Sequence, residues 1–203
     1  MISWPIKAAL GSGIFESVIV STDSEEIASI SIKYGATVPF ERPKELSDDF
    51  TIAPKVIKHA LEWLIENKEP PDFICTIYPT SPLLEAEDLR EACKLFLQSK
   101  ADITFSGAEF PFPIQRAIKL NDEGRVSMFS PEHYLTRSQD LEKAYQDAGQ
   151  FYFSTTRAIL EEWPVFSEIA SLYVMPRHKV VDIDTPEDWE LAEKLFEVNK
   201  SSG

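Results

Sequence analysis

The sequence has few basic residues for its length. Its 203 residues include 20 lysines and arginines against 34 aspartates and glutamates, which gives a formal net charge of −14. This balance excludes a surface built to hold the phosphate backbone of nucleic acid, which requires an excess of positive charge. It does not exclude a nucleotide ligand, because a local site can be basic on an acidic protein. We therefore expect no nucleic-acid partner.

Cysteine is scarce as well, and long apolar runs are missing. The two cysteines, Cys75 and Cys93, stand in apolar surroundings without metal-ligand spacing, so we expect free thiols in a reducing compartment. No apolar stretch approaches the roughly 20 residues that span a bilayer, so we expect no membrane partner. The first residues lack the basic and apolar pattern of a secretory signal, and we expect a cytoplasmic protein.

Hydrophobic residues make up 43% of the chain, which is enough for the core of one ordinary domain. We place this domain at residues 1–199 and expect a disordered tail at 200–203. Three apolar runs alternate with amphipathic segments, and the runs lie at 18–20, 73–77 and 101–107. This alternation predicts a doubly wound α/β fold around a mostly parallel sheet. Turn residues near 119–126 predict a hairpin within an excursion that spans about 108–147.

An acidic pair near the end of the chain is the first candidate for a metal site. The residues before Thr185 read as a short strand, whose alternation places Asp182 and Asp184 on one face. Thr185 is predicted to cap a helix, with Asp188 at the capping-box position. Carboxylates that meet substrate phosphates suit Mg²⁺, so we predict that Asp182 and Asp184 bind this ion. The alternative is that one aspartate caps the helix and the other is solvated.

Polar loops follow the apolar runs at the positions where α/β sheets bind ligands. Asp23 follows the first run, and Arg42 and Thr51 bound the next loop. A stiff, proline-rich loop with Thr80 and Ser81 follows the run at 73–77. Structural alternatives stay open, because acids favour solvated turns and prolines fix a loop's shape whether or not it meets a ligand.

In this order the motifs resemble one family, the nonulosonic-acid cytidylyltransferases, which join CMP to nine-carbon keto sugars. The motifs are Ser21-Thr22-Asp23, Arg42-Pro43, Leu46-Ser47-Asp48-Asp49-Phe50-Thr51, Tyr78-Pro79-Thr80-Ser81-Pro82, Arg137-Ser138-Gln139-Asp140, Asp147-Ala148-Gly149-Gln150-Phe151-Tyr152 and Asp182-Ile183-Asp184-Thr185. Together they span nearly the whole chain. The motifs at 137–140 and 147–152 favour the branch that acts on pseudaminic acid. Tyr78 stands where the sialic-acid branch typically carries a glutamine.

The resemblance implies a nucleotide-diphospho-sugar transferase-like fold. The excursion at 108–147 is of a kind that often serves substrate selection or dimer contact, and from it we expect a homodimer. The resemblance also implies transfer of CMP from CTP to a nonulosonic acid, with Mg²⁺ held by the catalytic pair Asp182 and Asp184. The residues expected along the nucleotide are Asp23, Arg42, Thr51, Thr80 and Ser81, and those expected at the sugar are Tyr78, Arg137, Gln139, Gln150 and Tyr152. The guanidinium fork of Arg137 suits the sugar carboxylate, although a salt bridge to Asp140 is the alternative.

The sequence departs from the family at its start. The family opens with a central strand and a loop of the type Pro-Ala-Arg-x-Gly-Ser-Lys that cradles the triphosphate, whereas this sequence begins after that segment. We expect a sheet with a gap and little or no activity for the chain as it stands. Ile52-Ala53 also replaces an expected hydroxyl. Two other functions stay open: a nucleotide-sugar-dependent glycosyltransferase of related fold, and a non-catalytic nucleotide- or sugar-binding remnant.

Overall fold

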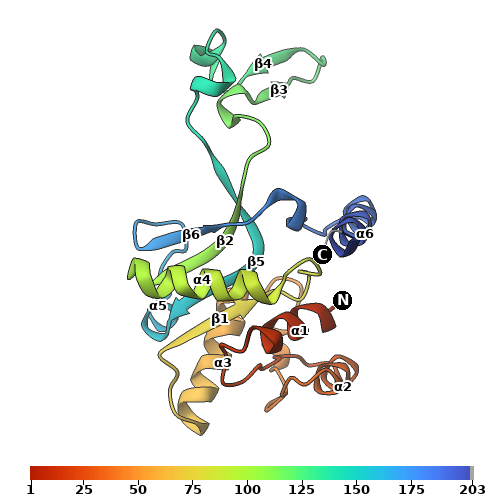
Figure 1. Ribbon diagram of the computed structural model, residues 1–203, viewed down its shortest axis with the longest axis vertical. Coiled ribbons are helices and arrows are strands. Elements are labelled where there is room, and N and C mark those ends of the chain that lie inside the picture. Colours follow the sequence, from red (N-terminus) through yellow and green to blue (C-terminus); the bar gives the residue numbers. More distant parts are fainter. Residues whose placement is uncertain (202–203) are drawn as a thin grey trace.

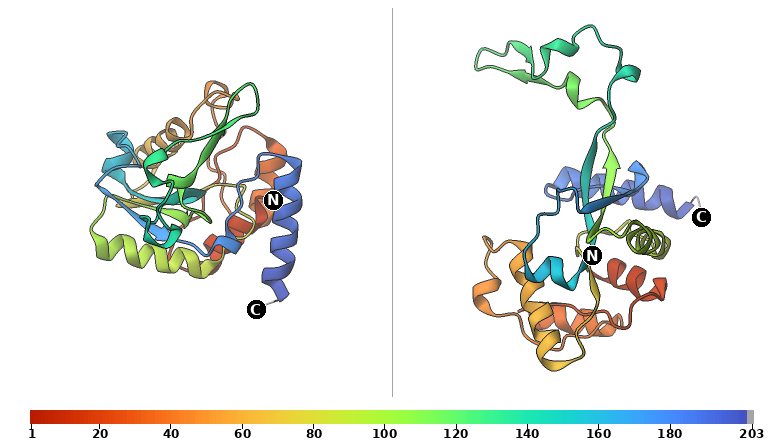
Figure 2. Two further views of the ribbon diagram at one scale, coloured as in Figure 1. Left: turned by 90° about the horizontal axis from the view of Figure 1, so that it is seen from above. Right: turned by 90° about the vertical axis from the view of Figure 1, so that its left-hand side faces the viewer.

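An α/β body and a projecting arm make up the computed structural model, which describes residues 1–201 (Figures 1 and 2). The helices are α1 (Ser3–Ser12), α2 (Glu25–Lys33), α3 (Ala53–Asn67), α4 (Ala86–Ser99), α5 (Thr156–Leu160) and α6 (Pro186–Ser201). The strands are β1 (Phe73–Ile77), β2 (Ile103–Glu109), β3 (Ile118–Leu120), β4 (Val126–Met128), β5 (Tyr145–Thr155) and β6 (Ala170–Val174). The predicted disordered tail is wrong for Lys200 and Ser201, which end α6, and its other residues lie outside the described range.

The main sheet has the strand order β1-β5-β2-β6. Strand β5 is antiparallel to both β1 and β2, and only β2 and β6 are parallel. The predicted α/β class is confirmed, but the predicted mostly parallel sheet is wrong, because the sheet is mixed. The reason lies in the path of the chain, which leaves the body along β2 and returns along β5, so the returning strand must run in the opposite direction.

The apolar run near Val18 does not form the predicted buried strand. Its residues make only isolated parallel bridges, Ile19 with Thr37 and Thr22 with Glu41. A ladder requires a neighbour over several residues, and the four-stranded sheet ends at β1 without reaching this segment. The run therefore packs against the core through partly buried side chains such as Val18.

The larger core lies between the sheet and helices α1 and α4. On α4, the buried residues Leu89, Ala92, Cys93 and Phe96 follow helical spacing and form one apolar stripe. This stripe packs on the β5 phenylalanines 151 and 153, both fully buried. Cys75 and Cys93 are free thiols, as the sequence predicts. A smaller core with Ile103, Phe105 and Ala158 covers the opposite face of the sheet.

A bulge interrupts the β2–β5 ladder just before the arm. The register shifts between Phe105 and Gly107, and the Oγ atom of Ser106 accepts the backbone N–H groups of Gln150 at 3.3 Å and Phe151 at 3.1 Å. Gly149 adopts a φ of +60°, which a residue without a Cβ adopts without strain. The bulge re-aims the side chains that lie next to the candidate site described below.

The arm comprises the residues between Glu109 and Tyr145, the last pair of the β2–β5 ladder. It carries the antiparallel strands β3 and β4, which confirms the predicted hairpin. Figure 2 shows that the arm stands clear of the body and joins it only through β2 and β5. Within residues 1–201, none of the helices combines the length and apolar character that crossing a membrane requires.

Candidate active site

The acidic pair lies in an extended segment at the start of α6. Residues 181–183 are in no strand, so the predicted short strand is wrong. The predicted capping box is confirmed, because Thr185 N donates to Asp188 Oδ2 at 2.9 Å and Asp188 N donates to Thr185 Oγ1 at 3.3 Å. Since Thr185 and Asp188 cap the helix, neither Asp182 nor Asp184 has to serve its end with a side chain.

The two carboxylates form part of a cluster of negative charge. Burial, followed by repulsion from Asp184, Asp188 and Asp147, raises the pKa of Asp182. Among residues 1–201, no side chain donates a hydrogen bond or forms an ion pair to the carboxylate of Asp182 or Asp184. Unpaired carboxylates close together favour a bound cation. The carboxylates of Asp182 and Asp184 fit Mg²⁺, because this ion is usually bound by one or two carboxylates together with waters and substrate phosphates. No group of three metal-ligating side chains occurs in the described chain.

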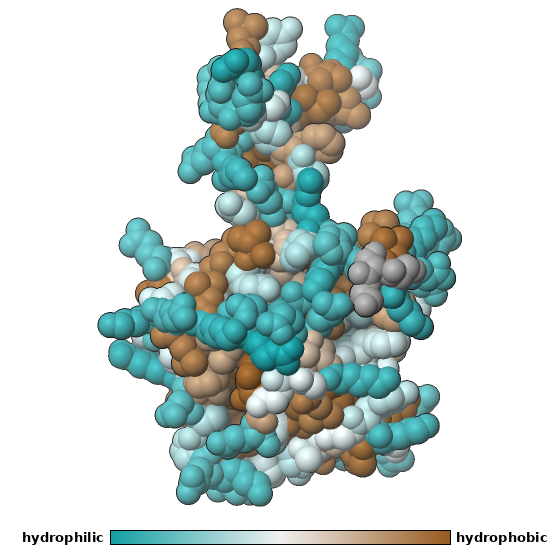
Figure 3. All heavy atoms as spheres, in the orientation of Figure 1, coloured by the Kyte–Doolittle hydropathy of each residue, from teal (hydrophilic) through white to brown (hydrophobic). Residues whose placement is uncertain are grey.

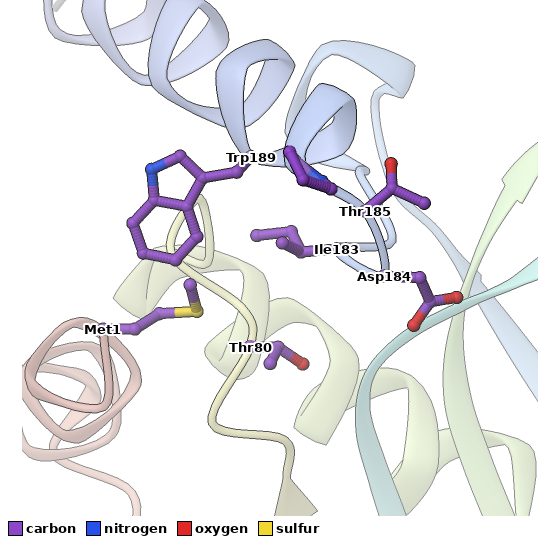
Figure 4. A pocket seen from close by; sticks show the side chains of 7 residues that line it. Met1, Thr80, Ile183, Asp184, Thr185 and Trp189 are labelled. Atoms are coloured by element: carbon purple, nitrogen blue, oxygen red, sulfur yellow. The ribbon is translucent and has the colours of Figure 1, made fainter.

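Asp184 and Thr80 line the same pocket, which has a volume of about 440 Å³. Figure 4 shows Thr80 on the loop that follows β1 and Asp184 on the segment that leads into α6, with Trp189 closing another side. The pocket therefore brings together a residue predicted for the nucleotide and a residue predicted for the metal. A ligand in it would touch a carboxylate, two threonine hydroxyls and an indole ring.

Two tyrosines and an aspartate stand beside the acidic pair. Tyr152 Oη donates to Asp147 Oδ2 at 2.6 Å, and the rings of Tyr78 and Tyr152 lie 5.4 Å apart. Burial, the Asp147 hydrogen bond and the charge of Asp182 all raise the pKa of Tyr152, so its hydroxyl stays protonated. Burial and Asp147 likewise raise the pKa of Tyr78. Asp147 was not among the predicted site residues, although its place beside Gly149 in the 147–152 motif marked it.

Ser81 and Gln150 have polar side chains that are engaged inside the protein. Ser81 is buried, and its hydroxyl donates to the Tyr78 carbonyl at 2.5 Å, which fixes the proline-rich turn. Gln150 is 2% exposed, and its Nε2 donates to the Lys179 carbonyl at 2.6 Å. Its Oε1 is buried without a partner in the described chain. Ligand contacts of these two residues stay predictions.

Asp23, Arg42 and Thr51 belong to a second group. Arg42 Nη2 lies 3.3 Å from Asp23 Oδ1, and Arg42 Nε donates to Ser47 Oγ at 3.1 Å. Thr51 N donates to Asp48 Oδ1 at 2.6 Å. No hydrogen bond or ion pair within residues 1–201 joins this group to the acidic pair. Its charged side chains are partly exposed and remain accessible to a nucleotide.

Arg137 and Gln139 lie on the arm, away from the body (Figure 1). Arg137 forms a bidentate salt bridge with Asp140, in which Nε donates to Oδ2 at 2.7 Å and Nη2 donates to Oδ1 at 3.1 Å. The structure thus contains the salt bridge that the sequence left open as an alternative. Both residues are exposed, and the arm of one chain does not bring them to the pocket of that chain.

Comparison with known proteins adds sequence and fold likeness. The model of the family described as cytidylyltransferase matches residues 1–200. The chain is 46% identical over 202 residues to the pseudaminic acid cytidylyltransferase of Campylobacter jejuni, covering 100% of this chain and 87% of that one. It is 30% identical over 213 residues to the CMP-N,N'-diacetyllegionaminic acid synthase of Legionella pneumophila, with the same coverage. The structure of a CMP:2-keto-3-deoxy-manno-octonic acid synthetase complexed with CTP superposes with a TM-score of 0.65 at 12% identity over 100% of this chain and 88% of that one, which shows a shared fold.

Proposed function

We infer that this chain, which belongs to the cytidylyltransferase family, transfers CMP from CTP to pseudaminic acid and releases pyrophosphate. The observation that carries the choice of sugar is the 46% identity to a pseudaminic acid cytidylyltransferase over the whole of this chain. The geometry supports the reaction class, because Asp184 and Thr80 line one pocket and the charge of Asp182 lies close to that of Asp184.

In the proposed reaction, the anomeric hydroxyl oxygen of the sugar attacks the α-phosphorus of CTP. A new oxygen–phosphorus bond forms, the bond to pyrophosphate breaks, and the hydroxyl proton passes to solvent water. Catalysis of such a transfer is mainly positioning and electrostatic stabilisation. We assign Asp182 and Asp184 the task of holding Mg²⁺, which when bound neutralises phosphate charge and polarises phosphoryl oxygens. Without a cation, the charge of these two residues would repel the triphosphate.

The sugar is assigned to the group of Tyr78, Tyr152 and Asp147, in which Tyr152 and Asp147 lie close enough to Asp182 to interact with its charge. Asp147 holds the Tyr152 hydroxyl at 2.6 Å, so the ring keeps one orientation beside Tyr78. The two hydroxyls offer hydrogen bonds to a polyhydroxylated sugar, and the ring faces offer an apolar surface. The nucleotide is assigned to Thr80 and to the loops with Asp23, Arg42 and Thr51. Arg42 would exchange its single ion pair with Asp23 for phosphate or ribose oxygens.

An assay with defined substrates tests this function. The chain is incubated with CTP, Mg²⁺ and pseudaminic acid, and CMP-sugar and pyrophosphate are measured against a reaction without protein. We expect both products in equal amounts, in place of the little or no activity that the departure at the start of the sequence suggested, and less product with N-acetylneuraminic acid or a legionaminic acid. Nucleotide binding by calorimetry without any product would favour a binding remnant. Transfer from a nucleotide sugar to an acceptor would replace the proposal by a glycosyltransferase.

We further propose that the arm packs against a second copy of the chain. Apolar side chains gather on the arm's surface, among them Phe112 at 79% and Leu135 at 89% exposure (Figure 3). Exposed apolar clusters of this kind mark protein–protein contacts. Because the arm carries Arg137 away from its own pocket, a dimer offers the arginine a route to the sugar carboxylate in the pocket of the other copy.

Introducing two negative charges among the apolar side chains of the arm is expected to dissociate the dimer. Each apolar side chain buried at an interface contributes about 1.5–3 kcal/mol, and each one occurs twice in a dimer. The double variant Phe112→Asp/Leu135→Asp should therefore sediment as a monomer at micromolar concentration, whereas the unaltered chain sediments as a dimer. Leu97→Asp, on the exposed side of α4, is the matched control and should stay dimeric. A monomeric unaltered chain would disprove the arm's proposed role.

A further inference from the structure

The segment that carries the acidic pair has little support from the sheet. The ladder of β6 ends at Val174, and Met175 makes one more backbone bond, from its N–H to the Gly107 carbonyl. Between that point and the cap of α6, the backbone-to-backbone hydrogen bonds of the described chain are local turn bonds, and side chains reach the carbonyls of His178, from Asn199, and of Lys179. Val181 packs on Leu83, which holds the segment's apolar side. Burial of Val181 alone does not fix the direction in which the carboxylates point.

Lys179, three residues before Asp182, is held through both its side-chain ammonium group and its backbone carbonyl. Its Nζ lies 2.6 Å from Glu85 Oε2 and 3.0 Å from Asp88 Oδ2, both at the start of α4. Its carbonyl oxygen accepts the Nε2 of Gln150, on β5, at 2.6 Å. The reverse orientation of the Gln150 amide would place two oxygens against each other, so the hydrogen bond defines the amide's orientation. One residue therefore connects α4, β5 and the acidic segment.

Asp88 is buried, and its partner Lys179 is partly buried. The side chain of Asp88 is 5% exposed and that of Lys179 is 14% exposed. Asp88 also accepts the N–H of Glu85 at 3.1 Å and the hydroxyl of Tyr173 at 3.4 Å, so it is satisfied on both oxygens. Burial lowers the pKa of Lys179, but its bonds to Glu85 and Asp88 outweigh this and raise it, so the ammonium group stays charged.

Such a pair adds little net stability, because removing the two charges from water costs about as much free energy as their attraction returns. Apolar side chains of similar volume stabilise a buried position as well as an ion pair does, because the attraction only offsets the loss of hydration. A hydrogen-bonded ion pair does, however, fix the orientation of its two side chains, whereas an apolar contact is not directional. The pair is therefore better explained by what it orients than by the stability it adds.

We propose that Lys179, held by Asp88 and Gln150, is a positioning residue that sets the place of Asp182 and Asp184 relative to the pocket. This inference rests on the proposed function, in which the acidic pair binds Mg²⁺. In this proposal Lys179 acts through its neighbours and is not itself a ligand of substrate or metal. Its effect is transmitted through the short backbone segment that joins it to Asp182. Residues that orient metal ligands in this way typically change metal affinity or activity by about 10–100-fold when they are replaced.

The test uses the double variant Lys179→Met/Asp88→Asn, in which both charges are removed and the asparagine can still accept the N–H of Glu85. The single variant Lys179→Met is made as well, although it leaves Asp88 buried without its counter-charge. Mn²⁺ binding is followed by electron paramagnetic resonance, and the rate of CMP-sugar formation is followed against Mg²⁺ concentration. Thermal unfolding reports stability separately.

We expect the double variant to unfold near the temperature of the unaltered chain, to bind Mn²⁺ about tenfold more weakly, and to need a correspondingly higher Mg²⁺ concentration for half-maximal rate. Lys94→Met is the matched control, because Lys94 forms an exposed ion pair with Glu91 on α4, the helix that carries Asp88. This control should change none of these values. A folded double variant with unchanged Mn²⁺ affinity and Mg²⁺ dependence overturns the positioning role. If Asp184→Asn also leaves Mn²⁺ affinity unchanged, the metal assignment itself fails, and the two failures can thus be told apart.

Discussion

Asparagine in place of Asp184 is expected to lower the rate of CMP transfer at least about a hundredfold, the loss typical when one group that stabilises developing charge is removed. The substitution keeps the size of the side chain and removes one of the two charges that we propose hold Mg²⁺ at the phosphates. Asp184 lies in the pocket with Thr80 and makes no side-chain bond in the described chain that the change would break. Folding should therefore be unaffected. Asp182→Asn is expected to act in the same direction, because the two carboxylates share one cluster of charge.

The measurement is the initial rate at several Mg²⁺ concentrations, with circular dichroism to confirm folding. Raising Mg²⁺ should not restore the full rate, because the amide oxygen carries no charge. Glu187→Gln is the matched control, since Glu187 is an exposed acid in the first turn of α6 and is absent from the pocket lining. It should retain nearly full activity. A normal rate for both aspartate variants would show that the pair does not serve the reaction.

The helices could be predicted because their signals are local. The apolar stripes of α3 and α4 repeat at helical spacing, and Thr185 with Asp188 forms the cap that its spacing predicts. The sheet order could not be predicted, because pairing is set by the path of the chain over long distances. An apolar run such as 73–77 has the same pattern whether its neighbour is parallel or antiparallel, and here the neighbour is β5.

The candidate site divides in the same way. Asp184 and Thr80 could be grouped because strand-to-helix loops of one sheet tend to meet. The part played by Lys179 could not be read from its surroundings in the sequence, because its partner Asp88 lies 91 residues away. The position of Asp147 depends on the bulge in the β2–β5 ladder, which cannot be recognised without the pairing register of the two strands. Nor does the order of the motifs show that Arg137 lies on an arm.

Alanine in place of Gly107 is expected to destabilise the fold by about 3 kcal/mol, the upper part of the range for overpacking a core. A Cβ at this position would lie 2.5 Å from Leu172 Cδ1 and 2.9 Å from the Gln146 carbonyl oxygen. The leucine can turn away, but the carbonyl belongs to the backbone of β5 and moves only with the strand. Gly107 lies in β2 between β5 and β6, so relief in either direction weakens a ladder.

The matched control is the same chemical change in α1. A Cβ at Gly11 would meet only the Cβ of Ala86, at an ordinary contact distance of 3.7 Å. Alanine favours a helix over glycine by up to about 1 kcal/mol, so Gly11→Ala should raise the unfolding temperature slightly. For a domain of this size, a loss of about 3 kcal/mol lowers the midpoint by roughly 6–12 °C. Calorimetry that gave the two variants similar midpoints would show that β2 and β5 do not approach as closely as described. Because the strain at Gly107 falls on the strand that carries Asp147 and Tyr152, the same variant should also weaken sugar binding at temperatures where it is still folded.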